Sequence, residues 1–179
     1  MDSPAEFLGF LRALWLCRHA EVKTRWNRSL PLADYIVDRW EKAKLLGYGE
    51  DTSVYDSCVI LGDVRVGDHC WIGPFTVLDG SGGTLEIGSY VSISAGVHIY
   101  THDTVRWAIS GGKEPYQNTP TCIGSRVYIG PHAIIGRGVT VGDGCIIGAH
   151  SFVNKSIPPG SRAWGCPAIV VGPAGHSDT

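Results

Sequence analysis

The sequence carries no excess of charge of one sign. Its 15 lysines and arginines oppose 17 aspartates and glutamates, which gives a formal net charge of −2 at pH 7. Proteins that bind nucleic acid usually present clustered positive charge, and neither half of this chain is polarised enough to suggest a charged polymer as partner. We therefore expect no nucleic-acid partner.

Long hydrophobic runs are also missing. The apolar stretch over residues 7–17 is interrupted by Arg12 and is shorter than the roughly 20 residues that a membrane-spanning helix needs. Asp2 and Glu6 precede it, whereas a secretory signal begins with positive charge. We expect a cytoplasmic protein and do not expect membrane contact.

The cysteines lack the paired spacing that is typical of zinc sites. They stand at positions 17, 58, 70, 122, 145 and 166. Cys58, Cys70 and Cys145 occupy inward positions of a six-residue repeat that fills most of the chain. We interpret the cysteines as reduced packing residues, and we predict no metal site.

What the sequence does contain is an internal repeat with a period of six. An aliphatic residue heads fourteen hexads, and glycine directly follows eight of these heads. The heads are Val54, Ile60, Val66, Ile72, Leu78, Ile87, Ile93, Ile99, Ile123, Ile129, Ile135, Val141, Ile147 and Val153. A period of six matches neither a helix nor a strand alone, so each hexad is predicted to be a short strand followed by a turn.

Three hexads would form one coil of a triangular prism. The head points inward, and so does the residue four positions later, where space near the axis is tight. These later positions hold only small or β-branched residues, as a narrow interior demands: Cys58, Val64, Cys70, Thr76, Val91, Val97, Val127, Ala133, Val139, Cys145, Ser151 and Ile157. Stacked coils would pair as parallel strands about 4.8 Å apart. The glycines after the heads are predicted to mark the corners, where the backbone turns sharply.

The first fifty residues read as helical. One helix is predicted over residues 5–24, laid on the prism through an apolar face that includes Phe7 and Leu11. A second helix is predicted to follow Pro31, from residue 32 to about 46, and to end at Gly47.

The chain divides by these patterns into three segments, within the usual length of a single domain. Residues 1–50 form the helical segment, residues 51–170 form the prism with a loop insertion at 103–121, and residues 171–179 form a tail.

The repeat breaks twice. The first break is a short insertion at residues 80–83, which we interpret as a longer corner turn. The second break is the insertion at 103–121, and long loops inside a compact repeat are uncommon unless they are functional. We expect this insertion to leave the prism and cover a cleft, with Trp107 and Tyr116 as candidate walls for a substrate.

Four features resemble the hexapeptide-repeat acyltransferases, in particular the branch of galactoside, maltose and antigen-polysaccharide O-acetyltransferases. They are the hexads, the His102-Asp103 pair, the segment Ile123–Gly130 and the closing run Ile147–Gly160. The resemblance covers residues 54 to about 170. It implies a mainly β fold, a left-handed parallel β-helix. It also implies acetyl transfer from acetyl-CoA, and a homotrimer with its sites between subunits.

The resemblance places the catalytic histidine at His102. A hydroxyl is a poor nucleophile at neutral pH, and the ordinary histidine pKa of about 6.5 suits a general base. Asp103 is the second catalytic candidate, to hold the ring or to contact the acceptor. Adjacent residues on extended backbone point apart, so a backbone carbonyl is an alternative partner for the imidazole. His98 is a candidate for a supporting position behind His102, out of direct contact with the substrate.

His132 and Tyr128 are further candidates for contacts with the acceptor. His132 and His150 share a hexad position eighteen residues apart, which predicts an outward ladder of imidazoles about 5 Å apart. The resemblance makes His132 a wall of the cleft between subunits. Tyr128, which aligns with a tryptophan of the family, is another wall. An asparagine of some relatives aligns with Gly96, so a backbone N–H would have to replace that amide at the oxyanion.

The resemblance also places the coenzyme along the coils toward the carboxyl end. Pro131 and Ala149 align with residues that contact the pantetheine arm through backbone groups. Asn154 and Lys155 align with contacts to the nucleotide end, where an ammonium near a phosphate is chemically sensible. Arg162 is a candidate to replace the arginines that relatives carry after the final coil.

Three other functions are to be weighed against sugar O-acetylation. The acceptor could be the amine of an amino sugar or of a nucleotide-linked amino sugar. A γ-type carbonic anhydrase shares this fold, but His98, His102 and His132 do not match its zinc-ligand spacing. A non-catalytic trimeric scaffold would not bind acetyl-CoA.

Overall fold

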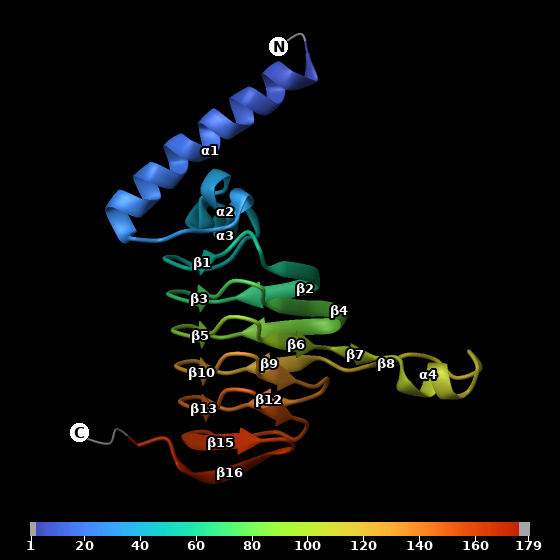
Figure 1. Cartoon of the computed structure of the whole chain (residues 1–179). Helices are drawn as coiled ribbons and strands as arrows, with labels where there is room; N and C mark the ends of the chain where they lie inside the picture. The colour runs from blue at the N-terminus through green and yellow to red at the C-terminus, as the bar shows by residue number, and fades with distance from the viewer. Residues whose placement is uncertain (1–2, 176–179) are drawn as a thin grey trace.

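The computed structural model describes residues 3–175 and shows helices at the N-terminal end followed by a stack of short strands (Figure 1). The helices are α1 (Pro4–Trp26), α2 (Leu32–Ile36), α3 (Arg39–Leu45) and α4 (Val105–Ile109). The strands are β1 (Ser53–Val54), β2 (Val59–Val66), β3 (Trp71–Ile72), β4 (Val77–Ile87), β5 (Ser92–Ile93), β6 (His98–Tyr100), β7 (His102–Asp103), β8 (Gln117–Asn118), β9 (Thr121–Ile123), β10 (Tyr128–Ile129), β11 (Ile134–Ile135), β12 (Thr140–Val141), β13 (Ile146–Ile147), β14 (Phe152–Val153), β15 (Ser161–Gly165) and β16 (Ala168–Pro173).

The hexads stack in the predicted register. One ladder pairs β1, β3, β5, β10 and β13 in parallel and aligns their heads, Val54, Ile72, Ile93, Ile129 and Ile147. A second aligns Leu78, Ile99, Ile135 and Val153, and a third aligns Ile87, Ile123 and Val141. The mainly β fold is therefore confirmed as a parallel β-helix with an N-terminal helical segment, and the left-handed sense of its coils is the one that the resemblance implies.

The interior of the prism is made of the residues that the repeat predicted. Every head is buried except Ile60, which is partly buried, and every fourth-following residue is buried except Val64. Burying one such aliphatic side chain contributes about 1.5–3 kcal/mol, so the column of heads is the main stabilising element of the prism. Cys58, Cys70 and Cys145 lie in this core as free thiols.

The glycines after the heads allow close stacking of the coils and do not make the sharp turn. None of the eight has a positive φ; the left-handed residue comes two positions later, as at His132, with φ 57°. A Cβ on Gly130 would lie 2.6 Å from the backbone nitrogen of Ala149 in the next coil. The physical reason that the sequence suggested for these glycines is therefore wrong, because the short distance between coils is what requires glycine at seven of the eight positions; the exception is Gly136, where the nearest atom to a Cβ is 3.4 Å away.

Helix α1 forms as predicted but does not lie on the prism. The Ser3 hydroxyl caps the helix by accepting a hydrogen bond from the Glu6 N–H at 3.2 Å. Among the residues of Pro4–Trp26, Val22 is the one that is buried. The helix leads away from the strands and contacts α2 (Figure 1). Phe7 is 50% exposed, so the apolar face expected to cover the prism is open in the single chain.

The single helix expected over residues 32–46 is two helices. Asp38 interrupts it, because its carboxylate accepts from the backbone N–H groups of Trp40 and Glu41 at 2.9 and 3.0 Å and so begins α3. Gly47 follows α3 with a φ of 72°, as a C-terminal glycine does.

The insertion leaves the prism as an arm. Strands β7 and β8 pair antiparallel and form its stem, and α4 lies toward its far end (Figure 1). Trp107 and Tyr116 pack edge to face with ring centroids 5.5 Å apart, and both remain exposed. The expectation that the arm covers a cleft is not met within one chain. The antiparallel hairpin of β15 and β16 closes the carboxyl end, and no helix within residues 3–175 is long and apolar enough to cross a membrane.

Candidate active site

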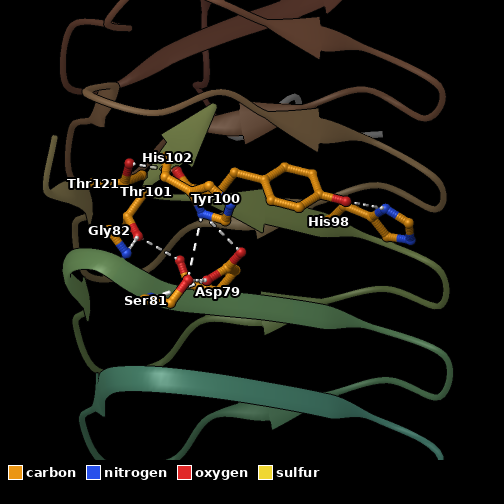
Figure 2. A network of polar contacts seen from close by, with 8 residues as sticks. All are labelled: Asp79, Ser81, Gly82, His98, Tyr100, Thr101, His102 and Thr121. Carbon is orange, nitrogen blue, oxygen red and sulfur yellow. Dashed lines mark hydrogen bonds and ion pairs between the residues drawn. The ribbon is translucent and has the colours of Figure 1, made fainter. Parts of the chain in front are cut away.

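His102 and Asp79 come from neighbouring coils and meet at the base of the arm. Strands β4 and β6 pair with Asp79 opposite Tyr100, so the chain after β6 passes beside the insertion that follows Asp79. The imidazole Nδ1 of His102 lies 3.1 Å from Oδ2 of Asp79 (Figure 2). The Asp79 side chain is 3% exposed, whereas that of His102 is 29% exposed, so one edge of the ring can reach a substrate.

Ser81 holds the Asp79 carboxylate in place. Both its backbone N–H, at 2.9 Å, and its hydroxyl, at 2.5 Å, donate to Oδ1 of Asp79, and its Oγ lies 3.4 Å from Nδ1 of His102. These bonds offset part of the cost of burying a charge. The insertion at 80–83, interpreted from sequence as a longer corner turn, therefore carries a residue of the site.

The backbone around this pair is tightly packed. Thr101 is fully buried, and its hydroxyl donates to the Asp79 carbonyl at 2.8 Å and accepts from the Gly82 N–H at 3.0 Å. A Cβ on Gly82 would lie 2.5 Å from the Cβ of His102. Glycine at 82 thus lets the two coils approach closely enough for the Asp79–His102 contact.

The arrangement is suited to general-base chemistry. A carboxylate only accepts hydrogen bonds, so Asp79 selects the tautomer of His102 that carries its proton on Nδ1. The lone pair is then on Nε2, which faces away from Asp79. A carboxylate beside the ring also stabilises the imidazolium that forms when Nε2 takes a proton.

Asp103, the carboxylate proposed from sequence to hold the ring, has other partners. Its Oδ2 pairs with Nε of Arg137, and its Oδ1 accepts from the Val105 N–H at 3.1 Å. The hydrogen bond from Arg137, and then that from Val105, hold the pKa of Asp103 below its usual range. Sequence reasoning missed Asp79, although an acidic residue directly after a head, where glycine is the commonest residue, was a usable signal.

An open groove of about 480 Å³ runs along the prism beside His102. It brings together His102, Asp103 and Asn154, which the sequence assigned to the catalytic and coenzyme sites. The other lining residues are Tyr100, Val105, Ile134, Gly136, Arg137 and Phe152. Tyr100 links the groove to His98, because the His98 Nδ1 lies 3.1 Å from the Tyr100 hydroxyl (Figure 2).

The remaining candidates lie outside this groove. Pro131 and Ala149 occupy stacked corners and are joined through the His150 N–H, which donates to the Pro131 carbonyl at 2.9 Å. Lys155 is exposed beside Asn154. Arg162 lies on β15, with its Nε buried and without a hydrogen-bond partner.

The predicted imidazole ladder is present. The rings of His132 and His150 stack with centroids 5.2 Å apart and planes 17° apart. Gly96 precedes them in the same column, where a Cβ would lie 2.5 Å from Nδ1 of His132. Tyr128 is 44% exposed on the adjoining strand. No group of three or more metal-ligating side chains converges in the part of the chain that the structure describes.

Residues 121–155 match the family described as bacterial transferase hexapeptide (six repeats). The repeats in this segment are therefore similar to those of the hexapeptide transferases. Its sequence is 40% identical over 89 residues to the galactoside O-acetyltransferase of Escherichia coli K12, a match that covers 49% of this chain and 43% of the relative. It is 31% identical over 112 residues to a putative colanic acid biosynthesis acetyltransferase of the same strain, covering 60% of this chain and 57% of the relative.

The fold extends the similarity beyond these segments. A hexapeptide-repeat acetyltransferase from Vibrio cholerae superposes with a TM-score of 0.61 at 27% identity and covers 92% of this chain and 93% of its own. A mutant N-acyltransferase from Bacillus cereus, solved with dTDP and coenzyme A, superposes with a TM-score of 0.64 at 26% identity over 72% and 73% of the two chains. The chain spans about half the length of the curated relatives, 43% and 57%. The resemblance to hexapeptide-repeat acyltransferases is confirmed.

Proposed function

We propose that this protein is an acetyl-CoA-dependent acetyltransferase that moves an acetyl group to a sugar hydroxyl. The observation that carries the proposal is the His102–Asp79 pair, which opens onto a groove that also contains Asn154. The curated relatives named as acetyltransferases and the coenzyme A complex of the Bacillus cereus enzyme support the same chemistry.

His102 is the general base of the proposed reaction. Its Nε2 takes the proton of the acceptor hydroxyl while the hydroxyl oxygen attacks the carbonyl carbon of the acetyl thioester. The carbon–sulfur bond then breaks, and the imidazolium returns the proton to the leaving thiolate. Asp79 stabilises the transient positive charge on the ring. General-base catalysis typically contributes about 10² to 10⁴-fold, and juxtaposition of the two substrates supplies much of the rest.

The coenzyme is proposed to lie along the coils from Pro131 and Ala149 toward Asn154 and Lys155. Asn154 lines the groove and Lys155 is exposed beside it, so an amide and an ammonium are available to a phosphorylated end group. Arg162 lies on β15 of the last coil and is proposed to reach the same end of the coenzyme.

The active protein is proposed to be a homotrimer with sites between subunits. Within one chain the arm projects away from the prism, and Trp107 and Tyr116 stand exposed on it. An arm of this shape would complete the groove of a neighbouring copy, where these aromatic rings could meet an acceptor together with Tyr128 and His132. Light scattering at working concentration tests this arrangement, and a monomer would contradict it.

Transfer to an amine is the second candidate function. The observation that favours it is the similarity to a Bacillus cereus N-acyltransferase solved with dTDP and coenzyme A. An acceptor of that class would be a nucleotide-linked amino sugar. The same base could serve it, because an ammonium must lose a proton before it attacks a thioester.

A thiol-release assay with acetyl-CoA separates these functions. Simple sugars, nucleotide sugars and nucleotide-linked amino sugars are offered as acceptors, and the acetylated product is identified as ester or amide by its stability to mild base. Turnover with a hydroxyl acceptor is the expected result, and turnover with amines alone would favour the second candidate. A protein that does not bind acetyl-CoA by calorimetry would be a scaffold.

A further inference from the structure

Arg137 joins both strands of the arm's stem to the prism. Its Nε pairs with Asp103 on β7, its Nη2 donates to the Gln117 side chain on β8, and its Nη1 donates to the Thr119 hydroxyl at 3.2 Å. Each of its three nitrogens therefore has a partner, and all three partners belong to the arm. Asp103 and Gln117 are themselves paired across the stem.

The position of Arg137 relative to His102 is specific. It lies two residues after Ile135, the head that is paired with Ile99 just before the arm begins. His102 is thus held from two sides. Its side chain contacts Asp79 on one neighbouring coil, and its backbone neighbour Asp103 is tied to Arg137 on the other.

The Arg137 contact is better placed than most ion pairs to fix geometry. Its side chain is 30% exposed and that of Asp103 is 34% exposed, and contacts of a planar guanidinium with several acceptors are directional. Thr119 adds a backbone tie, because its N–H donates to the Thr101 carbonyl at 2.8 Å. The stem cannot shift along the prism without breaking several of these bonds.

We propose that Arg137 is a positioning residue for His102, acting through Asp103 and the arm. The proposal rests on the proposed role of His102 as the base. A displacement of about 1 Å at a reacting group can cost roughly 10²-fold in rate, so loosening the stem should lower the rate of the chemical step. The guanidinium is occupied by protein acceptors, so it should contribute little to binding of either substrate.

The test compares Arg137→Gln and Arg137→Lys with Arg126→Gln. Arg126 is a matched control, because it too is an arginine paired with an aspartate, but its partner Asp143 is on a stacked coil and Arg126 lies outside the groove. Arg137→Gln should lower kcat about 10- to 100-fold and leave the KM for acetyl-CoA and for acceptor within about threefold of wild type, and Arg137→Lys should recover part of the loss. Arg126→Gln should behave as wild type.

Two further measurements separate positioning from loss of folding. Guanidinium ion added to Arg137→Ala should restore part of kcat, which a misfolded protein would not show. The effects of Arg137→Gln and Asp103→Asn on kcat should not be additive in the double variant, because both substitutions remove the same contact.

The outcomes separate the two proposals. Full activity of Arg137→Gln while His102→Ala is inactive would overturn the positioning role alone. A raised acceptor KM with unchanged kcat would make Arg137 an acceptor ligand and would also overturn it. Full activity of His102→Ala would instead remove the base on which both proposals depend.

Discussion

The Nδ1 atom of His102 lies 3.1 Å from the Oδ2 atom of Asp79, across two coils that are separated by 23 positions in the chain. The contact exists because neighbouring coils stack in register. Asp79 lies opposite Tyr100, two residues before His102. The contact gives His102 a buried anionic partner that its chain neighbour Asp103 does not provide. The orientation of the proposed base therefore depends on the insertion at 80–83, whose Ser81 holds the Asp79 carboxylate.

Asp79→Asn should lower kcat by about 10² to 10⁴-fold, with a small change in KM. The amide keeps the size of the side chain, but it no longer stabilises the imidazolium or selects the tautomer with a free Nε2. Steady-state kinetics check this, and Asp63→Asn, which removes an exposed carboxylate paired with Arg65, is the control. An Asp79→Asn enzyme with more than half of the wild-type kcat would show that the contact has no catalytic role.

Gly130→Ala should destabilise the protein by about 1–3 kcal/mol through overpacking. Its Cβ would meet the Ala149 backbone nitrogen at 2.6 Å, and backbone in a stacked coil cannot move aside. Gly136→Ala is the matched control, because the nearest atom to its Cβ, the Val153 carbonyl oxygen, is 3.4 Å away. Denaturant unfolding measures both, and equal stability of the two variants would refute the role of close coil stacking.

Two thiols of the native protein should react quickly with a disulfide reagent at pH 8. Cys17 and Cys166 are exposed, whereas burial raises the pKa of the Cys58 and Cys70 thiols and keeps them protonated. Labelling followed by mass spectrometry identifies the reactive positions, and Cys17→Ser and Cys166→Ser should each remove one fast thiol. Fast modification of Cys58 before unfolding would contradict the packed interior.

The stabilising effect of Asp103 should depend on pH in one direction. Arg137 lowers its pKa in the folded protein, so the contribution is fully present above the unfolded value of about 3.9 and is lost as pH falls through the lower, folded value. The stability difference between wild type and Asp103→Asn should stay constant from pH 7 to pH 5 and shrink below about pH 4. Thermal unfolding across this range measures it. A difference that already disappears at pH 5 would show that the pKa is not lowered.

The repeat was sufficient to predict the prism from the sequence, because six-residue spacing of aliphatic residues leaves few alternatives. Placement of the heads in register, burial of Cys145 and stacking of His132 on His150 all follow from the same spacing. The resemblance to a known family was needed for the handedness.

The contacts of the site were less predictable. Whether His102 meets Asp79 or Asp103 depends on how two insertions lie against each other, and insertions depart from the repeat that makes the rest predictable. The sequence did not indicate a role for Arg137. Its partners Asp103 and Gln117 are fourteen residues apart in the chain and come together only when the stem forms. The sequence predicted the length of helix α1 but not where the helix lies. An apolar helix face shows that something should cover it, but it does not specify which part of the protein does so.

The most direct test of the proposed function is the turnover of His102→Ala in the thiol-release assay, with the acceptor on which the wild-type protein is active. The variant should keep its fold and its affinity for acetyl-CoA, because His102 contributes one partly exposed ring. Its kcat should fall by about 10² to 10⁴-fold. A variant that retains wild-type kcat on the same acceptor would contradict the assignment of His102 as the base.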